Sequence, residues 1–132
     1  NMPHLQFDIN KSLKDDQRIK FVKAIKKKFS QIMKTSDGHI AISLRELPKY
    51  SMSLGRARES DSVCFMNLDI RNGRTSAQKR ELIRNYMNIV EKILNVKKEN
   101  QYATFTSHYG NDFNLYEKPL GDWFKNDSPL DK

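Results

Sequence analysis

The chain has 132 residues, of which 37% are hydrophobic and 30% are charged, and its formal net charge is +8. This length suits one domain with its own core, and no apolar run is long enough to span a membrane. The only cysteine, Cys64, cannot form an internal disulfide, which favours the cytoplasm. We therefore expect a cytoplasmic domain with no membrane partner, and the apolar residues around Cys64 predict a buried, unreactive thiol.

Hydrophobic periodicity predicts six elements in the order β-α-β-β-α-β. Alternating patterns indicate strands, and apolar residues at i, i+3, i+4 and i+7 indicate helices. Polar loops cover residues 48–61 and 95–100. In chain order, the elements are a strand at 4–9, a helix at 15–33, a strand at 40–45, a strand at 63–70, a helix at 76–94 and a strand at 102–107.

Helix boundaries have their own signals. Asp15 and Asp16 lie in the first turn of the first helix, where the helix dipole favours acidic residues. We expect Gly38 to supply the left-handed turn that ends this helix. Thr75 and Gln78 have the spacing of a capping box at the start of the second helix.

The first half of the chain resembles the second half shifted by 61 positions. In this register Asp8-Ile9 falls on Asp69-Ile70, Gln17 falls on Gln78, and the apolar positions of the two helices coincide. We expect one domain over residues 1–132, with a pseudo-repeat at 3–47 and 62–107 and a C-terminal arm at 108–132. In this α+β fold, two tandem β-α-β units form a four-stranded sheet with both helices on one face. We expect the other face to be apolar and covered by further subunits.

The turn before the second helix carries two arginines. Arg71 and Arg74 flank Asn72-Gly73, so their charges lie close to the free N–H groups of a helix N-terminus. Such a turn can hold a carboxylate or a phosphate. In the first half, Asn10 and Leu13 occupy the equivalent positions, so only one copy has these arginines. A surface salt bridge is the alternative role for Arg71.

Lysines gather on the first helix, at Lys20, Lys23, Lys26, Lys27 and Lys28. We interpret them as a solvated helix face and expect no nucleic-acid partner, because a helix packed on a sheet needs polar residues outside. The alternative is a nucleic-acid-binding module, whose affinity would fall steeply with salt.

Two stretches resemble signatures of the tautomerase superfamily. They are Met2-Pro3 and the turn-and-helix sequence Gly73-Arg74-Thr75-Ser76-Ala77-Gln78-Lys79. Residues 53–58 also resemble the double-length members, including the malonate semialdehyde decarboxylase branch. Asn1 precedes Met2, and we expect a natural chain to begin at Met2, whose removal would leave Pro3 as the amino terminus. Without the resemblance, we would interpret Pro3 as an incidental second residue, as in most proteins that begin Met-Pro.

This resemblance implies a homotrimer with its site at a subunit edge, a small carboxylate substrate and no cofactor or metal. Pro3 would be the general base or acid, and Arg74 and Arg71 would hold the carboxylate. Phe113 would bind substrate, in an apolar wall to which Met52 and Leu54 could contribute. Other roles implied or open are an active-site aspartate (Asp37), a gate over the site (Arg56 and Arg58) and an arm anchored on a neighbour (Trp123 and Phe124).

The chain also departs from the family patterns. The dehalogenase-type histidine is absent from the first helix, and Phe105 stands where those enzymes have tyrosine, which argues against dehalogenation. Asn72-Gly73-Arg74 replaces the Arg-Pro-Arg of the decarboxylases. We therefore expect a tautomerase acting on a small 2-oxo acid. The alternatives are a decarboxylase or hydratase acting on a 3-oxo acid, in which Asp37 would be more than a turn residue, and a non-catalytic member that binds a carboxylate or a protein.

Overall fold

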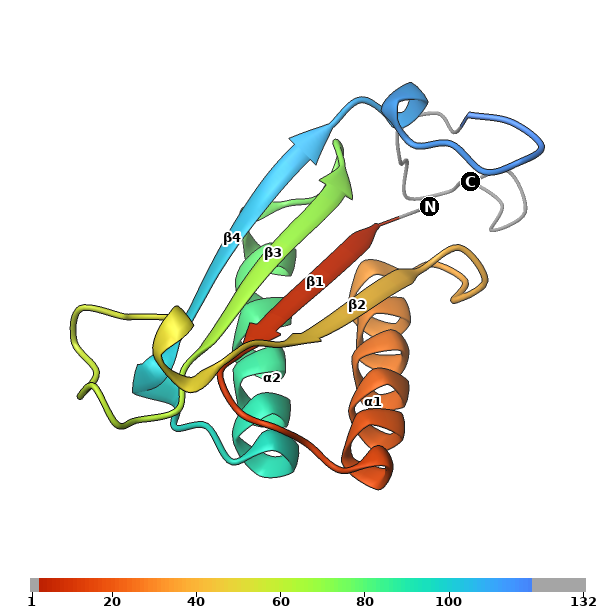
Figure 1. Ribbon diagram of the computed structural model, residues 1–132. Coiled ribbons are helices and arrows are strands. Elements are labelled where there is room, and N and C mark those ends of the chain that lie inside the picture. Colours follow the sequence, from red (N-terminus) through yellow and green to blue (C-terminus); the bar gives the residue numbers. More distant parts are fainter. Residues whose placement is uncertain (1–2, 120–132) are drawn as a thin grey trace.

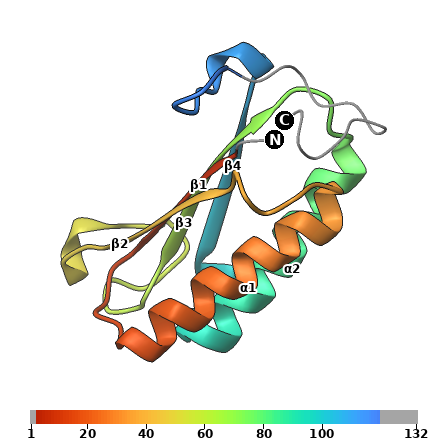
Figure 2. The ribbon, with the colours of Figure 1, turned by 90° about the vertical axis from the view of Figure 1, so that its right-hand side faces the viewer.

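The computed structural model describes residues 3–119, which form one sheet and one layer of two helices (Figure 1). In chain order the elements are β1 (His4–Ile9), α1 (Asp15–Met33), β2 (Ala41–Glu46), β3 (Cys64–Arg71), α2 (Ser76–Leu94) and β4 (Gln101–His108). Short 3₁₀ turns lie at Lys49–Ser51, Lys98–Asn100 and Gly110–Asp112. Both helices cover the same face of the sheet, which confirms the predicted α+β architecture (Figure 2). Trp123 and Phe124 lie outside the described residues.

The strand order β2-β1-β3-β4 places the two β-α-β units side by side. Strand β1 is parallel to β2, β3 is parallel to β4, and the units meet where β1 runs antiparallel to β3. In this central pair, His4 lies opposite Asp69. The start of β1 therefore lies beside the end of β3, just before the turn that leads into α2.

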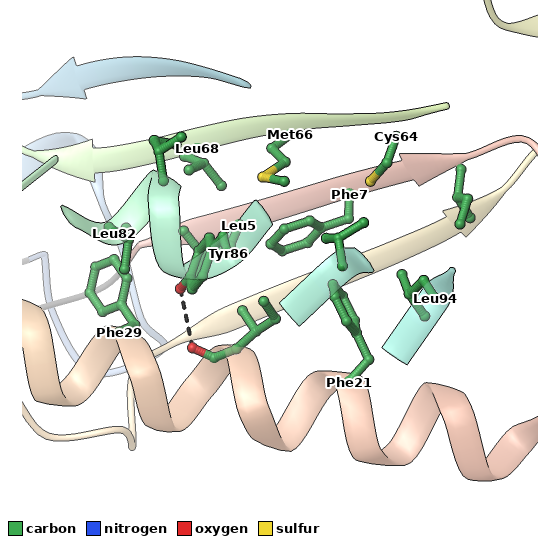
Figure 3. Packing of buried hydrophobic residues seen from close by; sticks show 14 of the residues in the cluster. Leu5, Phe7, Phe21, Phe29, Cys64, Met66, Leu68, Leu82, Tyr86 and Leu94 are labelled. Atoms are coloured by element: carbon green, nitrogen blue, oxygen red, sulfur yellow. Dashed lines mark hydrogen bonds between the residues drawn. The ribbon is translucent and has the colours of Figure 1, made fainter. Parts of the chain in front are cut away.

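The core lies between the sheet and the two helices, with aromatic rings near its centre (Figure 3). The ring of Phe7 makes edge contacts with Phe21, at 5.0 Å between centroids, and with Tyr86, at 5.7 Å. The Tyr86 hydroxyl donates a hydrogen bond to the carbonyl of Ile25 at 3.1 Å, which joins α2 to α1. Burial raises the pKa of Tyr86, so the hydroxyl stays a donor. Within residues 3–119, no helix combines the length and apolar character needed to cross a membrane.

In the first turn of each helix, a glutamine side chain folds back onto the backbone that precedes the helix. The Thr75 N–H donates to Oε1 of Gln78, and the Gln78 N–H donates to Oγ1 of Thr75, each at 3.0 Å. These two bonds confirm the predicted capping box. At α1, the Lys14 N–H donates to Oε1 of Gln17 at 3.0 Å. Because a lysine side chain cannot accept a hydrogen bond, only half of the capping box is available there.

The same two glutamines also join the helices to each other. The Gln17 side chain donates from Nε2 to the carbonyl of Ile93 at 3.1 Å, and Gln78 donates to the carbonyl of Ile32 at 3.5 Å. Donor and acceptor in the first bond each lie 61 positions from their counterparts in the second. This pair of contacts has the symmetry that an internal repeat would produce.

The first helix ends at Met33, as predicted, but Gly38 does not supply its left-handed residue. Lys34 takes the left-handed conformation, with φ of 56°, and its N–H donates to the carbonyl of Ser30. At the equivalent place after α2, Asn95 has φ of 58°. The role predicted for Gly38 is therefore wrong, because a non-glycine residue closes each helix and Gly38 lies in the later turn before β2.

The sheet face away from the helices is mostly polar, which corrects the expectation of an apolar face. Arg45 on β2 makes a bidentate ion pair with Asp8 on β1, with N–O distances of 2.7 and 2.9 Å. Side chains alternate between faces along a strand, so the residues between the core positions point outward. They include Gln6, Asp8, Ser43, Arg45, Asn67, Asp69, Thr104 and Thr106. Such a face can be hydrated, so its composition does not require that other subunits cover it.

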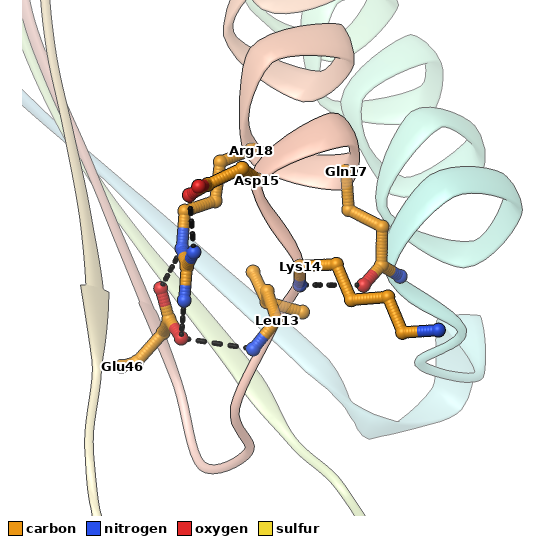
Figure 4. Close-up of polar contacts among 6 residues, drawn as sticks. All are labelled: Leu13, Lys14, Asp15, Gln17, Arg18 and Glu46. Carbon is orange, nitrogen blue, oxygen red and sulfur yellow. Dashed lines mark hydrogen bonds and ion pairs between the residues drawn. The ribbon is translucent and has the colours of Figure 1, made fainter.

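An ion-pair cluster ties the end of β2 to the start of α1 (Figure 4). The Arg18 guanidinium donates to both oxygens of Glu46, at 2.6 and 2.8 Å, and to Asp15 at 2.7 Å. The Leu13 N–H also donates to Glu46, at 2.9 Å. These donors, Arg18 above all, lower the pKa of the Glu46 carboxyl.

The lowered pKa of Glu46 predicts a pH-dependent contribution to stability. Its charged form is favoured in the folded chain, so the stabilisation is present above the unfolded pKa, about 4.3, and is lost as the pH falls through the folded pKa. Glu46→Gln should therefore cost about 1 kcal/mol at neutral pH, since partial exposure weakens these bonds, and almost nothing near pH 2. Urea unfolding at both pH values measures this. Glu99→Gln, at an exposed position, is the control, and an equal loss at both pH values would contradict the assignment.

Candidate active site

Pro3 lies at the start of the central strand pair. It is buried, and its carbonyl accepts a hydrogen bond from the Ala41 N–H at 3.0 Å, which joins it to the start of β2. On its other side is the end of β3, because the next residue, His4, lies opposite Asp69. The fold thus brings Pro3 to the end of the sheet where β3 turns into α2.

Arg71 and Arg74 occupy that turn, as the sequence predicts. Arg71 is the last residue of β3 and is 2% exposed, while Arg74 is 8% exposed just before α2. Between them, Gly73 has φ of 116°, which favours glycine, and the Asn72 N–H donates to the carbonyl of His108 at 2.8 Å. The turn is therefore held in place by β4, and Arg71 is not a surface residue.

The two guanidinium groups are close enough to affect each other. Burial, and then the charge of Arg71, lower the pKa of Arg74 to about 9, so Arg74 is still charged at neutral pH. A bound carboxylate would offset this repulsion and could accept paired hydrogen bonds from a guanidinium group. The site is therefore chemically suited to a small carboxylate.

Phe113 reaches the same region from the segment after β4. It is buried, and its ring makes an edge contact with His108 at 5.4 Å between centroids. His108 in turn pairs with Arg71 in the register of β3 and β4. Phe113 therefore lies at the same end of the sheet as Arg71.

Sequence analysis missed one polar pair at this end of the sheet. Nε2 of His108 lies 3.2 Å from Oδ1 of Asp69 on the neighbouring strand. The predicted last strand ended at residue 107, so His108 was assigned to the C-terminal arm and its contact with Asp69 was not predicted. A last strand that extended to His108 would have placed this residue beside β3, where Asp69 and Arg71 lie on the same face.

Asp37 lies in the loop that leads to the same end of the sheet. Its carbonyl accepts a hydrogen bond from the Ile40 N–H at 3.3 Å, one residue before the N–H that bonds to Pro3. Its side chain is exposed. Asp37 therefore lies in the loop that leads to the residue bonded to Pro3. Its backbone makes a local turn contact, which is what a purely structural turn residue would do.

The loop residues proposed as a wall or a gate lie elsewhere. Met52, Leu54, Arg56 and Arg58 belong to the loop between β2 and β3, which enters β3 at Cys64. Cys64 pairs with Ile9, at the opposite end of β1 from Pro3. Within one chain, these four residues therefore lie far from Pro3.

The opposite end of the sheet, equivalent under the repeat, is closed by neutral residues. Asn10 is buried, donates to the carbonyl of Lys49 at 2.9 Å and accepts from the Val63 N–H at 2.8 Å. Leu13 is buried in the core. Burial raises the pKa of the Cys64 thiol to about 12, as expected for an unreactive cysteine. Within residues 3–119, no group of three or more His, Cys, Asp or Glu side chains could hold a metal ion.

Solved structures resemble this chain, although no family model and no curated protein matches it. The macrophage migration inhibitory factor-like protein of Entamoeba histolytica gives a TM-score of 0.77 at 14% identity, over 91% of this chain and 100% of that one. Pt0534 inactivated by 2-oxo-3-pentynoate gives 0.77 at 12%, over 88% and 94%. The asymmetric trimer of R7 fused 4-OT gives 0.72 at 21%, over 88% and 94%.

A malonate semialdehyde decarboxylase and a member of the cis-3-chloroacrylic acid dehalogenase family also match. The names of these proteins differ in the activity they state, whereas their structures all align with this chain. At identities this low, the similarity shows a shared fold and does not show a shared reaction. The chain therefore shares the fold of these proteins.

Proposed function

We propose that this protein is a tautomerase that interconverts the keto and enol forms of a small 2-oxo carboxylic acid. The observation that supports this most strongly is that Pro3 and two buried arginines lie at the same end of the sheet. The arginines would hold the carboxylate, and the proline would move the proton. This chemistry requires a chain that begins at Pro3, because only then is the proline nitrogen an amine.

The arginines would also lower the pKa of the Pro3 amine. An α-amine has an ordinary pKa of about 7.7–8.0, and nearby positive charges and burial both disfavour its protonated form. Pro3 is buried, and the end of β3 that carries Arg71 lies beside it. The amine would therefore be largely neutral at pH 7 and able to remove a proton from the carbon next to a carbonyl. It would then return the proton at the other end of the enol system.

The two arginines would have different roles. Arg74 precedes α2, where free N–H groups and the helix dipole also favour an anion, so it would bind the carboxylate. Arg71 could bind the same group or stabilise the enolate oxygen that forms during the reaction. Phe113 would shield the site from water. We further propose a homotrimer, since R7 fused 4-OT, which has this fold, is a trimer.

An electrophilic 2-oxo acid tests the proposal. We would treat a chain that begins at Pro3 with 2-oxo-3-pentynoate, which inactivates Pt0534, and locate the adduct by peptide mass spectrometry. We expect one adduct, on the Pro3 nitrogen, which excess pyruvate prevents. A chain that retains Asn1 and Met2 should gain none there. Labelling of other amines only, or none at all, would count against a reactive proline beside a carboxylate site.

A decarboxylase or hydratase acting on a 3-oxo acid is the second candidate, and the position of Asp37 favours it. The Asp37 loop leads directly to the N–H that bonds to Pro3. If Asp37 orients water, Asp37→Asn should lower decarboxylation of malonate semialdehyde roughly 10²-fold or more, the usual range for a general acid or base, and leave keto–enol exchange within about twofold. Ser36→Ala in the same loop is the control. Equal small effects of both changes on both reactions would assign Asp37 to the turn alone.

A further inference from the structure

The Asp69–His108 pair lies beside the proposed carboxylate site and has no role in the reaction described above. Nε2 of His108 is 3.2 Å from Oδ1 of Asp69, and both side chains are about one-third exposed. Phe113 packs edge-on against the imidazole, so the ring is held from two sides. A histidine fixed in this way has a defined position relative to Arg71.

His108 and Arg71 are direct partners across the parallel pair of β3 and β4. Paired residues of adjacent strands point to the same face, so the imidazole is a near neighbour of the Arg71 side chain. The backbone adds a second connection, since the Asn72 N–H donates to the His108 carbonyl at 2.8 Å. A change of charge at His108 therefore occurs next to the group that is to bind the carboxylate.

Charged and titratable groups of three neighbouring segments lie around the imidazole. On β3 these are Asp69 and Arg71, and on β1 the His4 side chain lies on the same face opposite Asp69. Asp112, in the turn after β4, is exposed. The imidazole thus lies between one acidic and one basic side chain of β3. Histidine is the side chain that ordinarily changes charge between pH 5 and 8.

We propose that His108, oriented by Asp69, is a positioning residue that strengthens carboxylate binding at Arg71 when the imidazole is protonated. This inference rests on the proposed function, because it assigns the carboxylate to the Arg71 site. The protonated ring adds a positive charge beside Arg71, so the anion binds more tightly at low pH. Substrate affinity then depends on pH in a way that is separate from the titration of the catalytic amine.

Binding of pyruvate, a 2-oxo carboxylate that stays ionised over this pH range, tests the inference without catalysis. We would measure its dissociation constant at about pH 5.5 and 8.5 for the unmodified protein and for His108→Gln. The amino terminus is the same in both chains, so their difference isolates His108. We expect pyruvate to bind roughly 3- to 10-fold more tightly at the lower pH, relative to His108→Gln, as for one partly screened charge.

Two further variants separate positioning from simple folding. His4→Gln removes an exposed histidine of the same face, bonded to Ser43, and should keep the pH dependence. Asp69→Asn removes the charged partner that orients the imidazole and should weaken the pH dependence, because the ring is no longer held beside Arg71. A His108→Gln protein with unchanged pH dependence, or a His4→Gln protein that loses it, would overturn the inference. Activity of the chain that begins at Pro3 is measured separately, so an active enzyme with pH-independent binding would refute only the role of His108.

Discussion

Replacing Arg74 with alanine is expected to lower kcat/KM for tautomerisation roughly 10²- to 10³-fold, equivalent to about 3–4 kcal/mol of lost transition-state stabilisation. Arg74 is buried at the start of α2 and keeps its charge at neutral pH, since its pKa is lowered only to about 9. The carboxylate is held throughout the reaction, so much of the loss should appear in KM. Steady-state kinetics with phenylenolpyruvate measures both parameters.

Two controls accompany this prediction. Arg80→Ala removes an exposed arginine from the same helix and should change kcat/KM less than twofold. Arg74→Lys keeps the charge without the planar fork and should recover only part of the activity. Circular dichroism would establish that each variant is folded. A folded Arg74→Ala protein with normal kcat/KM would remove Arg74 from the site.

The largest expected effect on stability comes from Phe7→Ala. The Phe7 ring is fully buried at the centre of β1, between the rings of Phe21 on α1 and Tyr86 on α2. Alanine would leave a cavity bordered by both helices and the sheet, so the free energy of unfolding should fall by about 3–5 kcal/mol. Urea unfolding at one fixed protein concentration measures this loss.

Tyr50→Ala is the matched control for this change. Tyr50 is 75% exposed in the loop after β2, so losing its ring should alter the free energy of unfolding by less than about 0.5 kcal/mol. Similar losses in the two variants would show that Phe7 does not occupy the centre of the core.

Most of the fold follows from patterns that are local in the sequence. The capping box at Thr75 and Gln78 set the start of α2, and the alternation from His4 to Ile9 set β1. The predictions failed where more than one residue could satisfy the same local rule. Gly38 was a sound choice for a left-handed residue, but Lys34 adopts that conformation at modest cost and ends the helix first.

The site was harder to predict because it depends on strand register. Pro3, Arg71 and Arg74 could be named from motifs, and the fold brings them to one end of the sheet. The pairing of His108 with Arg71 depends on where β4 begins relative to β3, which periodicity does not define. Leu54 was assigned to the apolar wall from its position in the sequence alone, which does not define the end of the sheet that a loop covers.

The most direct test of Pro3 as the catalytic amine compares two forms of the same chain. One begins at Pro3, as verified by intact mass, and the other retains Asn1 and Met2, so that its proline nitrogen is an amide. Tautomerisation of phenylenolpyruvate and 2-hydroxymuconate should be rapid in the first form. In the second it should fall to the rate of the uncatalysed reaction, because an amide cannot accept the proton. Equal activity in the two forms would contradict a mechanism based on the Pro3 amine.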